Sequence, residues 1–405
     1  MDIVEKGMLA GVNDERISKL LKLLSADDSH HVRFFSAPGR VEIGGNHTDH
    51  QHGRVLAAAV DYCMLAAAVD DNSDTIHMES SGFGSYEVSI ADLSPVKDQE
   101  GTSEAFIRGV AEYLENRGYK VGGFKASLDS DVPAGGSMSS SACFGVLVGA
   151  VINGLFNDGA IPYQELAKAA KYAENVHFGK PCGLMDQMAS AAGGFVFIDF
   201  KDEVYPEVEK IDFDFTHSGY TMCILNSKGS HASLTEQYAS IPQEMFTVAK
   251  ALGHEYLREV DPDEFYANIG KIRGEVSDRA LMRAMHFFDD DRRAELERDA
   301  LKASDIKRFL ELINRSGESS QMLLENVSPE DPFNRSLSLS IAYAKHLLNG
   351  KGACRVQGGG FAGTAEAFVP NSEVEEFTRK FTELFGENSV LIAGIRNYGA
   401  VEVKI

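Results

Sequence analysis

Three glycine-rich segments lie far apart in this chain of 405 residues, at 39–53, 133–142 and 358–363. Glycine lets a backbone turn tightly and approach a ligand, and the serine hydroxyls of the second segment can donate hydrogen bonds to phosphate. Each segment alone could be an ordinary turn. Together with the run G-L-M-D-Q at 183–187, they indicate one shared site for a phosphorylated ligand and a polar small molecule, as a small-molecule kinase requires.

Length and composition fit an ordinary soluble protein of two or three domains, since 43% of the residues are hydrophobic and 25% are charged. The formal net charge of −22 argues against nucleic acid or an anionic membrane as a partner, because both attract a basic face. The same charge repels free ATP. A phosphate site in this chain therefore needs backbone amides, a divalent cation and a few basic side chains.

The sequence begins without a basic segment followed by an apolar run, so we expect no signal peptide. No stretch approaches the roughly eighteen uninterrupted apolar residues of a membrane span. The five cysteines are an odd number, widely scattered, and form no C-x-x-C pair. We therefore expect a cytoplasmic protein without a zinc or disulfide framework.

Hydrophobic periodicity predicts mixed helices and strands. Residues 143–152 are apolar on nearly all sides, which predicts a buried helix. Other helices are predicted at 14–25, 104–116, 164–177, 289–301 and 305–313, within a charged helical region at 240–330. A hairpin is predicted at 80–86, and strands at 32–36, 56–60, 63–69, 123–128, 195–200, 220–225, 353–356, 364–369, 390–392 and 401–405.

The second glycine segment directly precedes the apolar helix, so the unpaired amides and the positive end of the helix dipole would face an anion. The alternative is an ordinary turn with a serine cap. The segment lacks the G-K-[ST] ending of a Walker A loop and the G-x-G-x-x-G spacing of a Rossmann motif.

Asp186 could accept the proton of a substrate hydroxyl or fix the orientation of that hydroxyl. Its alternative role is a helix N-cap or a carboxylate at the edge of the core. Glu174 by itself would be a surface helix residue, but a kinase also needs an acidic ligand for magnesium. A zinc hydrolase site at His47, Asp49, His50 and His52 is disfavoured, since no histidine cluster follows to complete the shell.

At these residues the chain resembles the galactokinases of the GHMP small-molecule kinases. Their motif G-R-V-N-L-I-G-E-H-T-D-Y-x-x-G aligns without a gap with G-R-V-E-I-G-G-N-H-T-D-H-Q-H-G at 39–53. Their P-x-G-x-G-L-S-S-S-A corresponds to 133–142, and their C-G-I-M-D-Q to 182–187. Their R-M-T-G-G-G-F-G-G corresponds to 355–363, and their N-S-N…H…Y stretch is echoed by Asn226, Ser227, His231 and Tyr238.

The resemblance implies the α+β, two-lobed GHMP kinase fold. Residues 1–210 would form an N-terminal lobe like domain 2 of ribosomal protein S5, residues 211–405 a ferredoxin-like C-terminal lobe, and the active site would lie between them. By motif position, Asp186 would be the catalytic base, and Arg40 would steady Asp186 and the transferring phosphoryl group. Ser141 and Glu174 would bind Mg²⁺. The sugar contacts would be Asn46, His47, Thr48, Asp49, Gly183 and Tyr238. The ATP contacts would be Gly135, Gly136, Ser137, Met138, Ser139, Ser140, Ser141, Gly358, Gly359 and Gly360.

The implied reaction is transfer of a phosphoryl group from MgATP to the C1 hydroxyl of galactose, by a monomer or weak homodimer. The alternatives are a kinase for galacturonate, N-acetylgalactosamine or arabinose, and a non-catalytic sugar sensor. The intact S-S-S-A run at 139–142, together with Glu174 and Asp186, favours an enzyme.

The sequence departs from the family motifs at several positions. Asn46 replaces a glutamate, His50 a tyrosine, and Ser137 and Ala362 replace glycines, while the usual arginine pair after Tyr238 is absent. The resemblance places residue 46 beside the C6 position of the sugar. Asn46 is therefore expected to relax or redirect recognition there, and it makes galacturonate permissible.

Overall fold

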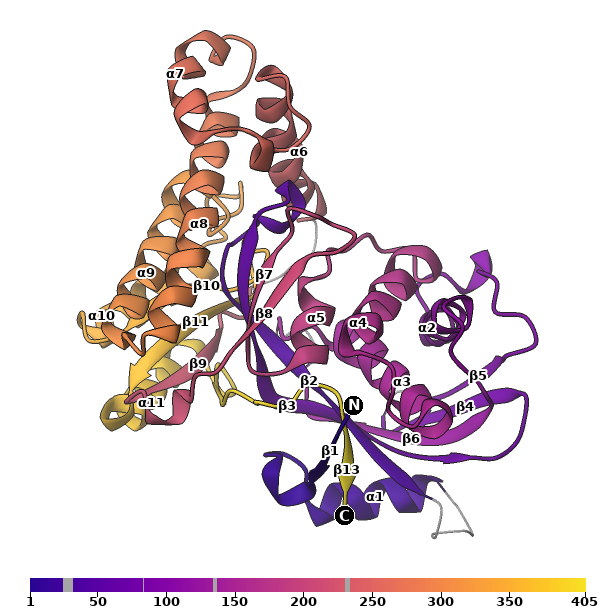
Figure 1. The fold of residues 1–405 in the computed structure, drawn as a ribbon. Helices are drawn as coiled ribbons and strands as arrows, with labels where there is room; N and C mark the ends of the chain where they lie inside the picture. The colour runs from indigo at the N-terminus through magenta and orange to yellow at the C-terminus, as the bar shows by residue number, and fades with distance from the viewer. Residues whose placement is uncertain (25–31, 83, 134–136, 230–233) are drawn as a thin grey trace.

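The computed structural model describes residues 1–24, 32–82, 84–133, 137–229 and 234–405. Two β-sheets form its framework, and helices pack on both (Figure 1). This arrangement has the α+β content and the two sheets that the motifs led us to expect.

The larger sheet has nine strands in the described part of the chain. Seven follow the order β1-β13-β2-β3-β6-β4-β5, while β7 pairs with β3 and β8 pairs with β7. Their bounds are β1 Asp2–Glu5, β2 Arg33–Gly44, β3 Arg54–Asp70, β4 Thr75–Ser80, β5 Gly84–Ser89, β6 Phe124–Ser130, β7 Phe195–Asp199, β8 Glu207–Ile211 and β13 Val401–Lys404.

The long strand β3 corrects the expectation of two separate strands at 56–60 and 63–69. Its first part pairs with β7 and its second part with β6. Asp61 lies at the changeover, where its amide donates to Gly394 O at 3.1 Å. A polar residue interrupts the apolar pattern there without interrupting the strand.

The smaller sheet consists, among the described residues, of β9 (Tyr220–Asn226), β10 (Ala353–Val356), β11 (Thr364–Pro370) and β12 (Val390–Ala393). Its order is β10-β11-β9-β12 and its pairs are all antiparallel. This order is that of a ferredoxin-like lobe.

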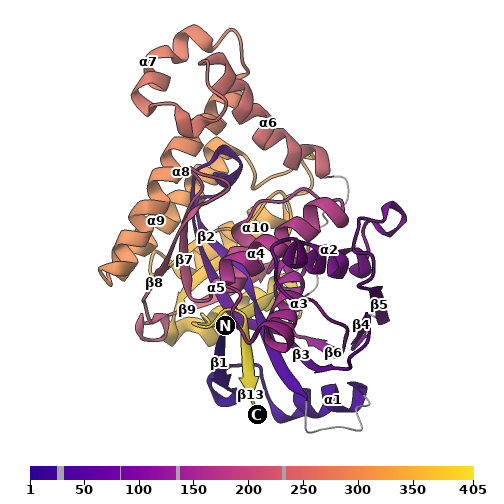
Figure 2. The ribbon, with the colours of Figure 1, turned by 45° about the vertical axis from the view of Figure 1, so that its right-hand side comes forward.

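Helices α2 (Ser103–Asn116), α3 (Ser140–Asn157), α4 (Tyr163–Tyr172) and α5 (Met185–Ala192) gather beside the larger sheet (Figure 2). The π-turn η5 (Ala173–His177) continues α4. Among the described residues, α3 alone is long and apolar enough to cross a membrane by length and composition, and 67% of it is buried inside the protein. It is the central core helix that the apolar run predicted.

The charged region forms α6 (Thr235–Ala251), α7 (Pro262–Ile272), α8 (Asp278–Lys302) and α9 (Ile306–Ser319), followed by the π-turn η8 (Ser320–Leu324). Parts of α6, α7 and α8 project beyond both sheets (Figure 1). The remaining helices, α10 (Ser336–Leu348) and α11 (Val374–Phe385), pack on the smaller sheet through a separate apolar cluster.

The first and last strands lie side by side, because β1 pairs in parallel with β13, and the two termini lie at opposite ends of this pair (Figure 1). Helix α1 (Asp14–Leu24) covers them through buried Ile17, Leu20 and Leu24. Since β13 belongs to the larger sheet, the end of the chain returns to the first lobe, and the division at 210/211 remains a prediction.

Most predicted elements are present with shifted ends. Sequence reasoning missed β1, β8, α5, α10 and α11, of which β1, β8 and α5 have eight residues or fewer. Strand β2 extends from 33 to 44, beyond the strand predicted at 32–36 and into the first glycine segment.

Gly44 lets α8 approach β2. A Cβ atom at this position would lie 1.7 Å from Oε2 of Glu297, whose carboxyl oxygens have no hydrogen-bond partner among the described atoms. We predict that Gly44→Ala lowers the free energy of unfolding in urea by about 1–3 kcal/mol. The losses in Gly44→Ala and Glu297→Ala should be less than additive in the double variant. Additive losses would show that the methyl group added at residue 44 does not clash with Glu297.

Candidate active site

Arg40 and Asp186 form a two-pronged ion pair where β2 meets the first turn of α5. Nε and Nη2 of Arg40 donate to Oδ1 and Oδ2 of Asp186 at 2.7 and 2.6 Å. Burial lowers the pKa of Arg40, but the neighbouring Asp186 carboxylate outweighs this and the pKa is raised overall. The guanidinium therefore stays charged, and the planar contact fixes the orientation of the carboxylate.

The second glycine segment lies directly against this pair. Ser139 Oγ donates to Asp186 Oδ2 at 2.7 Å. Ser137 O accepts from Arg40 Nη1 at 2.5 Å and from Gln357 Nε2 at 2.9 Å. Ser137 and Ser139 have φ of 54° and 52°, a left-handed conformation that is strained for non-glycine residues and is often found at functional sites.

Helix α3 begins just after this strained segment, at Ser140. The unpaired amides and the positive dipole of its first turn suit an anion. The predicted ATP contacts Gly135 and Gly136 lie outside the described residues, as does His231. Met138 is buried, with 1% exposure, so this predicted ATP contact can take part only through its backbone, whose carbonyl accepts from Arg40 N at 3.1 Å.

The third glycine segment is tied to the first by its carbonyl groups. Gly358 O accepts from Asn46 Nδ2 at 2.8 Å, and Gly359 O lies 3.0 Å from His47 Nε2. Gly358 and Gly360 have φ of 67° and 83°, which glycine adopts without strain. The loop that follows β10 therefore lies against the first motif, as the prediction of one shared site requires.

Glu174 is buried and lies in the π-turn η5, where Ser141 Oγ donates to its Oε1 at 3.0 Å. Lys180 Nζ donates to the same oxygen at 3.0 Å, and Gln187 Nε2 donates to Oε2 at 2.9 Å. The structure thus brings together the two predicted magnesium ligands. A hydroxyl and a carboxylate are oxygen donors of the kind Mg²⁺ takes, so these residues fit that ion.

A cavity of about 210 Å³ opens beside the Arg40–Asp186 pair. Three of the predicted sugar contacts, His47, Asp49 and Gly183, line it. A Cβ atom on Gly183 would lie 2.6 Å from Oδ2 of Asp49, so a larger residue there would displace the Asp49 carboxylate. The remaining lining residues are Arg40, Glu42, His50, Cys182, Met185, Asp186, Gly358 and Gly359.

His47, His50 and Asp49 form a hydrogen-bonded group in the wall of this cavity. His47 Nδ1 lies 3.3 Å from His50 Nε2, and His50 Nδ1 lies 3.0 Å from Asp49 Oδ1. Burial and the neighbouring His50 lower the pKa of His47 to about 3. Burial raises the pKa of Asp49, but His50 outweighs it and the pKa falls to about 2. In the described residues no group of three or more His, Cys, Asp or Glu could hold a metal ion.

The structure corrects the prediction that Asn46 contacts the sugar. Its side chain has no exposed surface and does not line the cavity. Nδ2 donates to Glu42 Oε1 at 2.7 Å and to Gly358 O. Oδ1 accepts from Asn326 Nδ2 at 2.8 Å and from Ser320 Oγ at 3.2 Å. Asn46 therefore packs behind the cavity wall, and no direct contact with C6 is available to it.

Thr48 and Tyr238 also have internal roles in place of the predicted sugar contacts. Thr48 is buried, and its Oγ1 donates to Gly45 O at 2.8 Å and to Arg54 O at 2.6 Å, which closes the turn. Tyr238 OH donates to Gly360 O at 2.8 Å, and its ring packs edge-on against Phe361. Both residues shape the glycine segments from outside the cavity.

A second cavity, of about 250 Å³, adjoins the first turn of α3 and contains residues that sequence reasoning missed. Ser140 and Ser141 line it. Its other walls are largely apolar and aromatic, formed by Met64, Tyr86, Phe106, Leu128, Val132, Phe144 and Phe178 with Ser80, Ser103, Asp129 and Ser130. Such a cavity suits a flat heteroaromatic group joined to an anion at the helix terminus.

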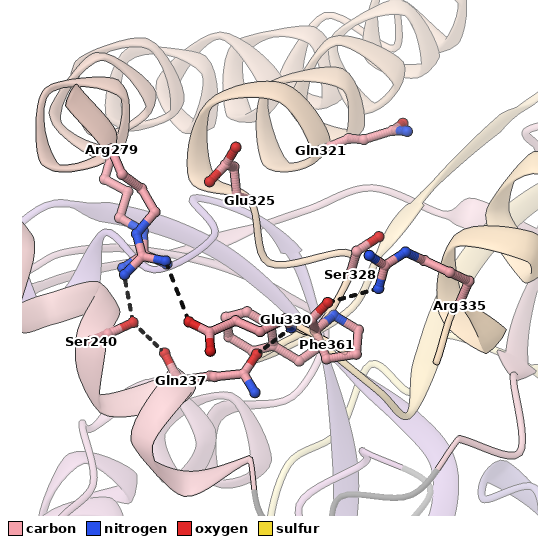
Figure 3. A pocket seen from close by; sticks show the side chains of 11 residues that line it. Gln237, Ser240, Arg279, Gln321, Glu325, Ser328, Glu330, Arg335 and Phe361 are labelled. Carbon is pink, nitrogen blue, oxygen red and sulfur yellow. Dashed lines mark hydrogen bonds and ion pairs between the residues drawn. The ribbon is translucent and has the colours of Figure 1, made fainter. Parts of the chain in front are cut away.

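A further cavity, of about 270 Å³, lies between α6, α8 and Phe361 (Figure 3). It shares no lining residue with the cavity beside Asp186. Arg279 and Arg283 both pair with Glu244, at 2.7 and 3.0 Å. Arg335 Nη1 donates to three backbone carbonyls. Arg279 also pairs with Glu330 at 3.7 Å. The arginines of α8 thus connect this helix to α6 and to the segment before α10, while Arg335 bonds within that segment.

Two family models match the chain. The model described as GHMP kinases N terminal domain matches residues 105–194, and the galactokinase galactose-binding signature matches residues 26–69. The galactokinase of Glaesserella parasuis is 30% identical over 357 residues, which cover 86% of this chain and 88% of the relative. The galactokinase of Streptomyces coelicolor is 30% identical over 358 residues, with coverage of 87% and 88%.

Solved structures show the same fold. A galactokinase of Lactococcus lactis complexed with galactose superimposes with a TM-score of 0.81 at 23% identity, covering 96% of this chain and 99% of that chain. A mevalonate kinase of Methanococcus jannaschii superimposes with a TM-score of 0.63 at 15% identity, covering 91% and 99%.

The pKa of His47 leads to a prediction. Because burial and His50 lower that pKa to about 3, the His47 ring should remain neutral between pH 8 and pH 5 in the folded protein. An unperturbed histidine, with a pKa of about 6.5, takes up a proton over this range. The unfolded chain therefore binds this proton first, and stability should fall as the pH drops below about 6.5. NMR titration of the histidine side chains, with His47→Gln for assignment, measures this; a His47 signal that titrates near pH 6.5 would contradict it.

Proposed function

This chain belongs to the galactokinase family, and we propose that it is an ATP-dependent sugar 1-kinase that converts galactose and ATP to α-D-galactose 1-phosphate and ADP. One observation carries the proposal: the Arg40–Asp186 pair lies in the wall of a polar cavity and contacts the serine segment at the start of α3. A sugar hydroxyl and a terminal phosphate can meet at that point.

Asp186 accepts the hydrogen bond of the C1 hydroxyl and takes its proton as the oxygen bonds to the γ-phosphorus. The bond from that phosphorus to the ADP oxygen breaks. Arg40 holds Asp186 in place and offsets negative charge on the transferring group. Phosphoryl transfer asks little covalent chemistry of a protein, so positioning and charge stabilisation account for most of the rate.

The amides at the start of α3, with Ser139 to Ser141 and the loop 358–360, bind the ATP phosphates. The apolar cavity next to Ser140 and Ser141 receives the adenine. Ser141 and Glu174 hold Mg²⁺, which would neutralise the phosphate oxygens when bound. Lys180, paired with Glu174 at 3.0 Å, adds local positive charge in a chain of net charge −22.

His47, Asp49 and Gly183 shape the sugar site, where the Asp49 carboxylate accepts hydrogen bonds from sugar hydroxyls. Galacturonate is disfavoured as the substrate, because Glu42, Asp49 and Asp186 all line the same cavity and would repel its carboxylate. N-acetylgalactosamine and arabinose remain the alternatives. The assembled Asp186, Arg40, Ser141 and Glu174 favour an enzyme over a non-catalytic sensor.

All five cysteines are free thiols, and four of them are buried, which supports the proposal of a cytoplasmic protein. We also propose that the protein is a monomer or a weak homodimer, as the family resemblance implies.

We predict that Asp186→Asn folds normally and loses phosphoryl transfer by at least about a hundredfold, the usual contribution of a positioned acid–base group. The amide keeps the size of the carboxylate but cannot take the proton. An ATP-consumption assay over galactose, galacturonate, N-acetylgalactosamine and arabinose measures both turnover and sugar choice. Near-normal turnover in folded Asp186→Asn would rule out this role.

Glu174→Ala is expected to raise the magnesium concentration needed for half-maximal activity, because one of two protein ligands is lost. Glu165→Gln is the matched control, since this acid of α4 pairs with Arg117 at 3.0 Å and lies in neither active-site cavity. If wild type and Glu174→Ala depend on magnesium concentration in the same way, Glu174 has only a structural role.

A further inference from the structure

Glu42 contributes a carboxylate to the cavity wall beside Asp186, a position that sequence reasoning did not assign. Asn46 Nδ2 and Arg355 Nη2 both donate to its Oε1, at 2.7 and 3.0 Å. Its Oε2 accepts no hydrogen bond from any described residue. One oxygen of the carboxylate is therefore held, and the other is left for whatever fills the cavity.

The strand places Glu42 at a useful distance from the reacting groups. Glu42 lies two residues after Arg40 in β2, and alternate residues of a strand share one face, about 7 Å apart. Arg40 pairs with Asp186. A ligand whose reacting hydroxyl lies at Asp186 thus extends along this face toward Glu42.

Asn46 and Arg355 fix this orientation. Both hydrogens of the Asn46 amide are donated and its oxygen accepts two bonds, which uses its full capacity. Arg355 comes from β10, is fully buried, and is charged. Neither partner can turn away from Glu42 without losing buried hydrogen bonds.

The charge of Glu42 suits a hydroxyl donor. Burial raises its pKa to about 6, against the opposing effects of Arg355 and Asn46, so it is ionised at neutral pH. The family motif quoted above has an amide at the position of Glu42 and a carboxylate at that of Asn46. This chain has the two residue types exchanged, which leaves the carboxylate, and not the amide, in the cavity wall.

We propose that Glu42 is a specificity-determining sugar ligand, whose free oxygen accepts a hydrogen bond from a hydroxyl remote from C1, with Asn46 and Arg355 as its positioning residues. This inference rests on the proposed sugar kinase function. If Glu42 has this role, its negative charge also helps to exclude anionic sugars. Oε2 of Glu42 is not among the buried atoms that lack a partner, and Glu42 lines the cavity, so this oxygen is accessible to a sugar hydroxyl that can donate to it on binding.

The test compares wild type with Glu42→Gln on galactose, galacturonate and the four monodeoxygalactoses that keep the C1 hydroxyl. Glu42→Gln should raise KM for galactose about tenfold with kcat nearly unchanged, since a charge-assisted hydrogen bond is weakened. The ratio of kcat/KM for galacturonate to that for galactose should rise. For one monodeoxygalactose, the one lacking the contacted hydroxyl, the difference between wild type and variant should vanish.

Glu366→Gln is the matched control. Glu366 is buried opposite Arg355 in the β10–β11 register and does not line the cavity. It should leave all these ratios unchanged. If Glu42 only balances the charge of Arg355, Glu42→Gln would alter every sugar equally, and this result would overturn the proposal while leaving the kinase intact. A wild type that neither binds galactose by calorimetry nor phosphorylates it would instead overturn the proposed function, and the role of Glu42 with it.

Discussion

The arrangement of the site depends on one contact between the two sheets, which the buried side chain of Arg355 makes. This arginine comes from β10 of the smaller sheet, has no exposed surface, and donates to Glu42 and to the Ile43 carbonyl in β2 of the larger sheet. A buried donor left without an acceptor commonly costs about 1–3 kcal/mol, so these two hydrogen bonds favour one arrangement of the two sheets. Because the third glycine segment follows β10 directly, the same contact brings that segment to the first motif.

The three glycine segments are then held together by side chains that contact backbone carbonyl groups. The carbonyl of Ser137 accepts from Arg40 of the first motif and from Gln357 beside the third. The carbonyl of Gly359 lies within hydrogen-bonding distance of His47. The acceptor in each contact is a backbone carbonyl, whose position depends on where the chain runs and not on its own side chain. This explains how Ser137, which replaces a glycine of the family motif, can still accept from Arg40 and Gln357.

Apolar periodicity predicted most core elements, and the resemblance to the family motifs predicted the fold and the pairs Arg40–Asp186 and Ser141–Glu174. Neither could predict which polar residues face the cavity. Residues 42 and 46 are both polar, and only the bulge between Glu42 and Gly44 and the partners from β10 and η8 decide that Glu42 faces inward. Short elements such as α5, and the return of β13 to the larger sheet, depend on contacts between distant residues that periodicity does not contain.

The charge distribution around the cavity also explains how a strongly acidic chain can handle anions selectively. Cationic groups gather on the side of the serine segment, where Arg40, Lys180 and the start of α3 face the expected phosphates. The carboxylates that line the cavity are Glu42, Asp49 and Asp186, while the Glu174 carboxylate lies beside Ser141 and Lys180. Under the proposed function this arrangement would favour a phosphate donor and a neutral polyol over an acidic sugar, because like charges repel. The proposed choice between anions therefore depends on local pairing and not on the net charge of −22.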